Sequence, residues 1–389
     1  MNMRWKRSVS IIVLLFITTF IFSGCWDYKE TEKLDVVIGI AIDKEDFTNE
    51  YIITGEIASP STGERQSKYQ SKIYSAKGKS ILEATRNFIP QTGRRTFWSN
   101  SNILILSKKI VEKDISKVLE WLYRESEIRG DLMTLVSNKS TAREILEKGQ
   151  NPDTIRSIEI AYALNNNKHI GTYPKTQLSK LVDNLKSKES TVLIPLIDLI
   201  NEEKKVGFQV MGSAILQQKK VIGYLKPEET QAALLLRNDI KHAVMVIDDS
   251  DNGGGNITII LYNPKIQIKP IDKNGELELN ITLKSSIDLN EITIDVDLTK
   301  KEEEENIRKQ CENALKKQLN NIINLSKNQY KADIFDFYYK IEAKTPSYIK
   351  KIKSGWEETY LQSKINIDVN LDIRSTKLII NPIRGGMKP

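Results

Sequence analysis

A cysteine near the N-terminus is the residue whose neighbours point most clearly to a chemical modification. Phe22, Ser23 and Gly24 stand directly before Cys25, in the pattern at which an export signal is cut and the thiol receives a diacylglyceryl group. Phe22 is the one departure, because leucine is commoner three positions before such a cysteine. Several acyl chains hold a protein on a membrane far better than one, since each buried methylene adds about 0.8 kcal/mol. The sequence therefore predicts lipidation of Cys25.

The segment before this cysteine has the three parts of a lipoprotein signal peptide. Basic side chains within residues 4–7 precede an apolar run from Ile11 to Phe22, and small residues follow. The run is shorter than the roughly 20 apolar residues that span a bilayer. We therefore expect residues 1–24 to be removed. A retained membrane anchor and an unmodified thiol are the weaker alternatives.

The other cysteine is predicted to be structural. Once Cys25 carries lipid, Cys311 is the only thiol left, so no intramolecular disulfide can form. Cys311 shares a helical spacing with Ile307, Leu319 and Ile322. This pattern favours a buried thiol over a reactive one.

The residue patterns of common enzymes are missing. His169 and His242 are far apart in the sequence and have no partner at metal-ligand spacing, so we expect no zinc site. The sequence contains no nucleophile elbow, Walker loop or dinucleotide fingerprint, and the glycine run 253–255 is predicted to be a turn. A glycosidase-like pair of carboxylates stays open, because its two acids can be far apart in sequence. We expect a protein that is not an enzyme and binds no cofactor or metal.

Three tryptophans have contrasting surroundings. Trp121 and Trp356 fall in amphipathic segments and are predicted to be core residues. Trp26 follows the predicted lipid anchor directly, so its indole belongs either in the lipid headgroup layer or against the protein.

Length and charge set the class of protein. The 389 residues are enough for two or three domains, and 40% hydrophobic with 28% charged residues is typical of a globular chain. The net charge of +7 falls to about +4 without the three basic residues of the signal peptide. This small excess is spread along the chain and indicates no nucleic-acid surface.

The first half alternates between apolar runs and helical patterns. We expect a buried strand at 34–44, its hairpin partner at 51–58 and an exposed loop at 59–72. Ser80 and Thr141 are placed to begin helices. The remaining expected elements are helices at 79–89, 114–124, 141–149, 153–167 and 176–187, and strands at 102–106, 132–136 and 191–200, the last interrupted by Pro195.

The second half follows a charged run, Asn201 to Lys205, which is the best candidate for a domain boundary. Two strands are expected within 207–225, then a helix at 226–239 with Pro227 in its first turn. The longest helix is expected at 301–328, and two shorter helices follow it. The remaining expected strands are 242–248, 256–262, 265–271, 276–287, 291–297 and a final antiparallel pair, 364–373 with 376–383.

Strands and helices are grouped rather than strictly alternating, which predicts an α+β fold with mixed sheets and packed helices in several domains. The expected limits are a signal peptide at 1–24, an N-terminal α+β domain at 25–200 and a C-terminal α+β region at 206–389. The last region is expected as one unit or as two subdomains dividing near 275–300.

Several stretches together resemble the Ger(x)C family of lipoproteins, the C subunits of nutrient germinant receptors in spore-forming bacteria. No single stretch is decisive, but their order and spacing match over nearly the whole chain. Asn100 and Lys377 depart from the histidine and glycine that many members have there. The matching stretches are Gly24–Asp43, Gly78–Phe88, Arg94–Ser107, Leu122–Ser137, Ala142–Leu146, Gly212–Thr230 and Lys331–Ile341, with Trp356 beyond.

The resemblance implies a lipid-anchored subunit without enzymatic activity. Its implied partners are two integral membrane subunits of the same receptor, and its implied place is the outer surface of the inner spore membrane. The complex would sense a small-molecule germinant, typically an amino acid or a sugar. Two other classes stay open: a solute-binding lipoprotein of a transporter, which usually has two wound α/β lobes, and a secreted lipoprotein hydrolase, which the missing motifs disfavour.

Overall fold

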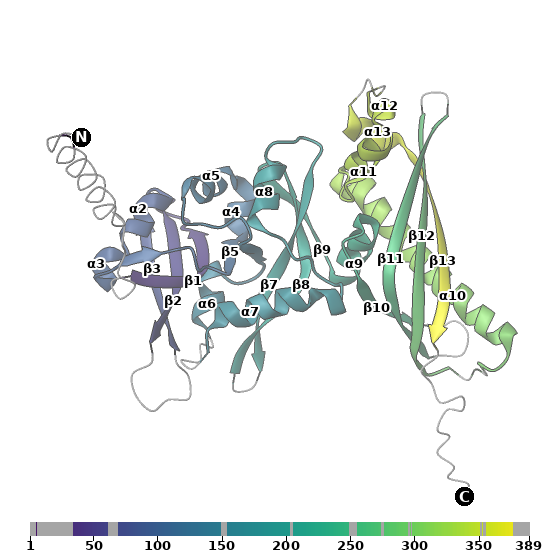
Figure 1. Ribbon diagram of the computed structural model, residues 1–389, viewed down its shortest axis with the longest axis horizontal. Coiled ribbons are helices and arrows are strands. Elements are labelled where there is room, and N and C mark those ends of the chain that lie inside the picture. The colour runs from purple at the N-terminus through teal and green to yellow at the C-terminus, as the bar shows by residue number, and fades with distance from the viewer. Residues whose placement is uncertain are drawn as a thin grey trace, which may run out of the picture.

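The computed structural model describes residues 34–60, 69–148, 154–202, 205–248, 255–273, 276–294, 296, 298–350, 352 and 355–375, together with Trp5. Cys25, Trp26 and the predicted last strand at 376–383 lie outside these residues. The described chain is elongated, with two β-sheets at successive places along its long axis (Figure 1).

The first sheet has nine strands in the order β3-β2-β1-β5-β6-β7-β8-β9, with β4 beside β1. Its centre, β1-β5-β6-β7, is parallel, and the hairpins at both ends are antiparallel. The strands are β1 (Leu34–Lys44), β2 (Tyr51–Pro60), β3 (Tyr69–Gly78), β4 (Arg95–Phe97), β5 (Ile103–Ser107), β6 (Met133–Ser137), β7 (Thr191–Glu202), β8 (Lys205–Gln217) and β9 (Lys220–Leu225).

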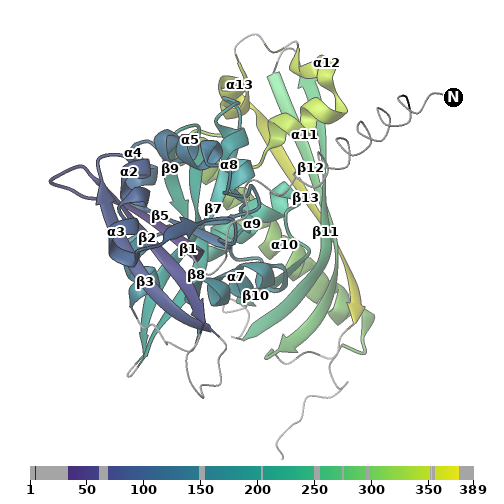
Figure 2. The ribbon, with the colours of Figure 1, turned by 60° about the vertical axis from the view of Figure 1, so that its left-hand side comes forward.

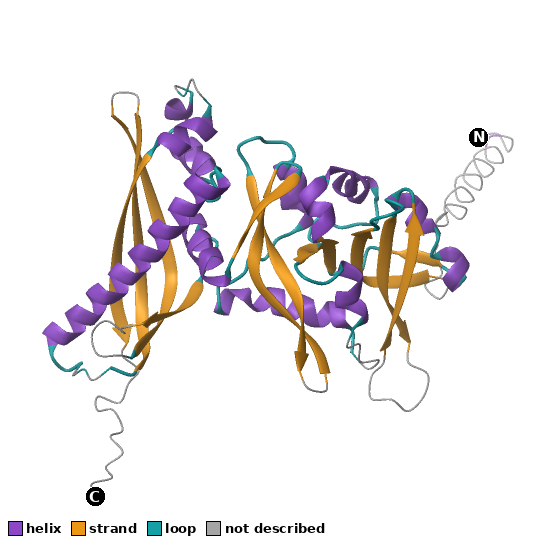
Figure 3. Cartoon of the chain, turned by 180° about the vertical axis from the view of Figure 1, so that it is seen from behind, coloured by secondary structure: helices purple, strands orange, loops and turns teal. Residues whose placement is uncertain are grey.

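Helices cover both faces of this sheet, so its central strands are buried on both sides. In β5, Leu104 and Leu106 face one core, while Ile103 and Ile105 face the other. The first core includes α2 (Ile81–Arg86), α4 (Lys108–Lys113), α5 (Ser116–Arg124) and α8 (Leu178–Asn184); the second includes α6 (Ala142–Glu147) and α7 (Arg156–Asn165) (Figure 3).

Two buried carboxylates of the sheet hold the starts of α6 and α7. Asp43 accepts hydrogen bonds from the backbone N–H groups of Ala142 and Arg143, at 2.9 and 2.8 Å. Glu56 accepts them from Arg156 and Ser157, at 2.9 and 2.7 Å. The first N–H groups of a helix have no partner within the helix, and a carboxylate also suits the positive end of its dipole.

The second sheet is a ribbon of four strands in the order β10-β11-β12-β13. The long helix α10 (Lys301–Leu325) crosses one of its faces (Figures 1 and 2). The strands are β10 (His242–Asp248), β11 (Asn256–Lys273), β12 (Glu276–Ile292) and β13 (Lys364–Ser375). The π-helix η4 (Ser326–Tyr330) follows α10, and α11 (Phe337–Lys344), α12 (Pro346–Ile349) and α13 (Trp356–Gln362) precede β13.

The helix α9 (Pro227–Arg237) joins the two sheets. Residues from Ala232 to Leu236 are buried in one hydrophobic core with the first-sheet residues Leu193, Ile215 and Leu225. The same core includes the inner faces of β11, β12 and α10. The two sheets therefore share packing through α9.

The observed fold is α+β with mixed sheets, as predicted. Strand 34–44 begins and ends where the sequence indicated, and Ser80 and Thr141 cap their helices with side-chain hydrogen bonds. Pro227 is the first residue of α9, and Ile307, Cys311, Leu319 and Ile322 are all buried on one side of α10.

Three predictions about strands were wrong. The predicted loop 59–72 contains the end of β2 and the start of β3. β11 is continuous where 256–262 and 265–271 were expected as two strands, because it passes Asn263, which has a positive φ of 46°, through an irregularity between Tyr262 and Lys265. β12 ends at Ile292, so among the described residues of the expected strand 291–297 only the first two are in a strand, where they continue β12. β13 pairs in parallel with β12, since α10 to α13 return the chain to the start of the sheet. Its expected antiparallel pairing with 376–383 stays a prediction, because that partner lies outside the described residues.

The segments predicted to divide domains lie within the sheets. Asn201 and Glu202 pair with Val206 and Lys205, so the charged run joins two strands of one sheet. The interval 275–300 contains β12, which pairs with β11 on one side and β13 on the other. The proposed limits of the domains stay predictions.

Candidate functional site

The predicted lipidation site, Cys25, lies outside the described residues, so lipidation stays a prediction. What the structure does place is the start of β1 at Leu34, nine residues after Cys25. Leu34 pairs in parallel with Arg95 of β4, next to α2 and α3 (Ile89–Thr92). The continuous described part of the chain therefore begins beside β4, at the end of the first sheet that carries α2 and α3.

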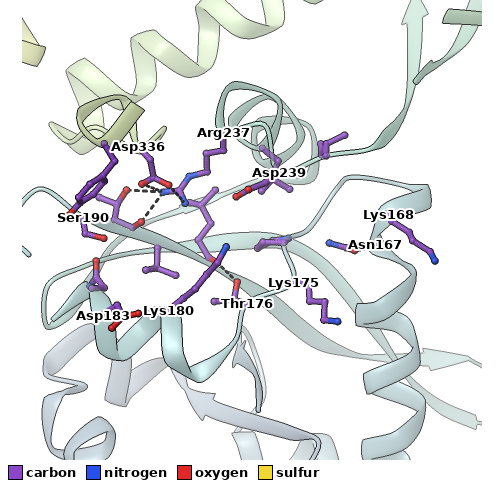
Figure 4. A pocket seen from close by; sticks show the side chains of 18 of the residues that line it. Asn167, Lys168, Lys175, Thr176, Lys180, Asp183, Ser190, Arg237, Asp239 and Asp336 are labelled. Carbon is purple, nitrogen blue, oxygen red and sulfur yellow. Dashed lines mark hydrogen bonds and ion pairs between the residues drawn. The ribbon is translucent and has the colours of Figure 1, made fainter. Parts of the chain in front are cut away.

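A cavity of about 600 Å³ lies where the two sheets meet (Figure 4). One wall comes from α8 and the start of β7, and the other from the end of α9 and the start of α11. Clefts between structural units are common places for small ligands. The sequence patterns predicted a functional role for none of the residues that line this cavity.

The wall of the cavity is held together by Arg237, the last residue of α9, which is only 8% exposed. Its Nε donates to the carbonyl of Ile334 and its Nη2 to the carbonyl of Thr191, both at 2.8 Å. Its Nη1 forms an ion pair of 3.0 Å with Asp336. The guanidinium thus ties α9 to β7 and to the segment before α11, and its donors are already used by the protein.

The lining of the cavity is mixed in charge. Lys168, Lys180 and Lys241 are exposed along it and form no ion pair with another described residue. Asp183, Asp239 and Asp336 also line it; Asp183 pairs with Lys186 at 2.8 Å and Asp336 with Arg237 at 3.0 Å. The arrangement suits a small polar molecule and provides no preformed clamp for an anion.

The segment before α11 is fixed by a second buried charge. Asp333 accepts backbone hydrogen bonds from Phe335 and Tyr338 and one from the indole of Trp356, all at 3.0 Å. Burial raises the pKa of Asp333. Nearby, Lys340 donates to the carbonyls of Leu236 and Phe335, and burial lowers its pKa to about 8. Asp333 and Lys340 thus hold the backbone around the start of α11, which explains why charged residues occur in this largely apolar segment.

The two histidines, far apart in the sequence, are brought together. His169 ends the short 3-10 helix η2 (Asn166–His169), and His242 begins β10. Their rings are stacked with centroids 6.5 Å apart and planes within 7°. Gln231 fixes the same contact by donating to the carbonyls of Ile170 and Val244. Among the described residues, no three His, Cys, Asp or Glu side chains are grouped to hold a metal ion.

The predictions for Cys311 and Trp356 are confirmed. Cys311 is fully buried, and burial raises the pKa of its thiol to about 12. Trp356 is 5% exposed in the core of the second sheet. Trp121 packs against the first core but is only partly buried, with its ring edge-on to Trp98.

Sequence reasoning missed Arg237, Asp333, Asp336 and Glu56. The sequence did contain one signal for three of them, a charged residue inside an apolar pattern. Arg237 ends an apolar helical run, and Asp333 and Asp336 interrupt an apolar stretch. A charge in such a place is rarely buried unless it is paired. The partners could not be named, because Arg237 and Asp336 are 99 residues apart.

None of the helices in the described part of the chain has the length and apolar character needed to cross a membrane.

Known proteins match both halves of the chain in order. The family described as "Spore germination protein N-terminal domain" matches residues 27–199, and the family described as "Spore germination B3/GerAC like, C-terminal" matches residues 211–377.

Individual relatives extend over nearly the full length. Spore germination protein KC of Bacillus subtilis is 23% identical, over 98% of this chain and 99% of that protein. Spore germination protein YndF of the same organism is 24% identical, over 96% and 98%. The crystal structure of the GerBC protein is similar in fold, with a TM-score of 0.58, 19% identity and coverage of 86% of this chain and 97% of that one.

Proposed function

The chain belongs to the family of spore germination proteins of the B3/GerAC type, and from this premise we propose that it is the lipid-anchored subunit of a spore nutrient germinant receptor. It acts without chemistry of its own, by assembling with two integral membrane subunits on the outer surface of the inner spore membrane. The small-molecule germinant is sensed by the assembled complex.

The observation that carries this proposal is the order of the matched regions behind the predicted anchor. The N-terminal family region begins at residue 27, two residues after Cys25, and the C-terminal region follows it to residue 377. The two matched regions, 27–199 and 211–377, therefore follow one another directly behind the predicted anchor, and a lipid on that cysteine would fix the first strand near the membrane.

The use of buried charges supports a binding role. Asp43 and Glu56 hold the starts of two helices, Asp333 holds the segment before α11, and Arg237 joins the two sheets. Each of these groups is used to position backbone. Such an elongated chain is suited to present different surfaces to different partners (Figure 1).

The alternative function, a solute-binding lipoprotein of a transporter, predicts two wound α/β lobes around a ligand cleft. The described residues form one nine-stranded mixed sheet and one four-stranded ribbon, which differ in size and topology. We therefore keep the receptor subunit as the proposed function.

Fractionation and co-purification from spore membranes test the proposal. We expect the tagged chain to occur in the membrane fraction and to co-purify with two multi-span subunits. Cys25→Ala should leave the membrane and impair germination, while the matched variant Cys311→Ala, which alters a buried thiol, should stay attached. A Cys25→Ala chain that stays in the membrane fraction when the partner subunits are absent, or Cys25→Ala spores that germinate normally, would contradict the proposal.

A further inference from the structure

The end of the molecule around α2 and α3 carries an exposed stripe of apolar and basic side chains. Leu82 and Ile89 are 50% and 39% exposed, and Arg86 between them is also exposed. The backbone of Asn87 and Phe88 stays in the right-handed helical region, so positions 82, 86 and 89 follow one side of the turn. We call Leu82, Arg86, Ile89 and the following exposed Arg94 the α2–α3 surface.

The opposite side of the same turn is already packed. Ile81, Ala84 and Phe88 are buried in the first core. The apolar side chains of the α2–α3 surface are therefore not needed for the fold, because the helices are anchored from behind. Large apolar side chains that face outward next to cations are typical of a surface that meets a membrane or a partner.

Two of the cations on this surface are free to meet an anion. Arg86 and Arg94 form no ion pair with any other residue that the structure describes. Arg95, by contrast, is engaged with Glu127 at 2.8 Å, and Glu83 accepts a backbone hydrogen bond from Lys79. Glu125 lines the same hollow as Leu82, Arg86 and Ile89, so one further acid lies beside Arg86.

The position of the surface is set by the start of β1. Leu34 pairs with Arg95, directly after Arg94. Leu34 is nine positions after Cys25, and an extended chain gives at most about 3.6 Å per residue, so the reach is roughly 30 Å. Figure 1 places α2 and α3 at the end of the molecule away from the second sheet. If Cys25 carries lipid, as the proposed function assumes, this end is held beside the bilayer.

We propose that the α2–α3 surface lies on an anionic phospholipid surface, with Leu82 and Ile89 in the headgroup layer and Arg86 and Arg94 at lipid phosphates. Basic side chains near an anionic leaflet are attracted to it, and tethering raises the local concentration so that a weak contact is populated. The first sheet then lies next to the membrane, and the second sheet points away from it.

A chemically tethered chain tests this contact without relying on lipidation in the cell. The protein without residues 1–24 is coupled through Cys25 to maleimide lipid in vesicles. Cys311 is buried, so it does not compete for the coupling. Amide hydrogen exchange of residues 81–94 is then compared on phosphatidylglycerol-rich vesicles and on pure phosphatidylcholine vesicles.

We expect exchange in this segment to slow about fivefold or more on the anionic vesicles only, and to recover at high salt. The double variant Arg86→Gln/Arg94→Gln and the double variant Leu82→Ser/Ile89→Ser should each lose most of the protection. The control Val246→Ser, at an exposed apolar residue of β10 in the second sheet, should keep it. Circular dichroism melts confirm that these exposed changes leave the fold intact.

Three results would overturn the proposal. The first is unchanged exchange in residues 81–94 on anionic vesicles when coupling is complete. The second is equal protection on neutral vesicles. The third is protection that occurs only when the membrane subunits are present, which would make the surface a protein contact. Because coupling here is chemical, a failure of Cys25 lipidation in cells would contradict the proposed function and leave this result standing.

Discussion

The indole nitrogen of Trp356 donates a hydrogen bond to the buried carboxylate of Asp333, with Nε1 and Oδ2 3.0 Å apart. Asp333 also holds the backbone of Phe335 and Tyr338, and the Trp356 ring packs against Tyr338 and Tyr360. One contact thus joins α13 to the segment that begins α11. An unpaired carboxylate at this depth would be costly, so the tryptophan both fills space and satisfies a charge.

Trp356→Ala is expected to lower the free energy of unfolding by about 3 kcal/mol or more, through the cavity and the lost hydrogen bond. Trp356→Phe keeps most of the volume and should cost roughly 1–2 kcal/mol. The control Phe47→Ala removes a fully exposed ring and should change stability by less than about 0.5 kcal/mol. Denaturant melts measure all three, and a cost for Trp356→Ala as small as that of the control would mean that the ring is exposed.

Lys340 should make stability rise with pH in the alkaline range. Burial lowers its pKa in the folded chain to about 8, against an ordinary value of 10.5. Between these values the unfolded chain binds more protons, so raising the pH favours the folded state. This gain in the free energy of unfolding is complete only when the pH exceeds the ordinary lysine pKa, and it is at most roughly 3 kcal/mol.

The variant Lys340→Met isolates this effect, because it removes the titrating group and keeps an apolar stem. Urea melts from pH 7 to 10 should show the difference in unfolding free energy between wild type and variant moving in favour of the wild type as pH rises. A difference that stays constant across this range would contradict the burial of a charged lysine.

Cys311 is expected to be unreactive in the folded protein. With a thiol pKa of about 12, only roughly one molecule in ten thousand carries the thiolate at pH 8, and the sulfur is also covered. In a chain that keeps an unmodified Cys25, iodoacetamide should label Cys25 quickly and Cys311 only after denaturant is added. Mass spectrometry of the peptides measures the labelling of each cysteine. Equal labelling of both in native buffer would show that α10 opens readily.

Arg237→Met should weaken the connection between the sheets. The change leaves Asp336 without its ion pair and two carbonyls without their donor, so we expect a loss of about 2–3 kcal/mol. The same substitution at Arg129, whose pair with Asp131 is exposed, should cost less than about 0.5 kcal/mol. Equal effects of the two variants in denaturant melts would show that the buried pair does not join the sheets.

Local patterns in the sequence predicted much of the fold, and long-range pairs account for what they missed. β1 was found because its run of buried apolar residues is unbroken, and Thr141 was found because a capping box is local. β3 was missed because it lies at the sheet edge and is largely polar, which looks like a loop. The parallel pairing of β13 with β12 and the stacking of His169 on His242 depend on residues far apart in the chain, which one sequence does not relate.

The proposed role in germination predicts that position at the membrane matters more than the chemistry of the anchor. Confinement to the surface reduces the translational freedom that docking must remove, so partners bind at a higher effective concentration. The chain without residues 1–25 should therefore bind the two membrane subunits detectably but weakly.

An unrelated transmembrane anchor that replaces Cys25 in the same orientation, with the same number of residues before Leu34, should restore much of the germination response. A matched chimera with a long flexible linker keeps the anchor but lets the α2–α3 surface leave the bilayer, and it should restore less. Germination rates of spores that carry each chimera measure both effects. If a folded, membrane-placed chimera with the short linker restores no response, the lipid itself is required, and placement alone does not explain the function of this subunit.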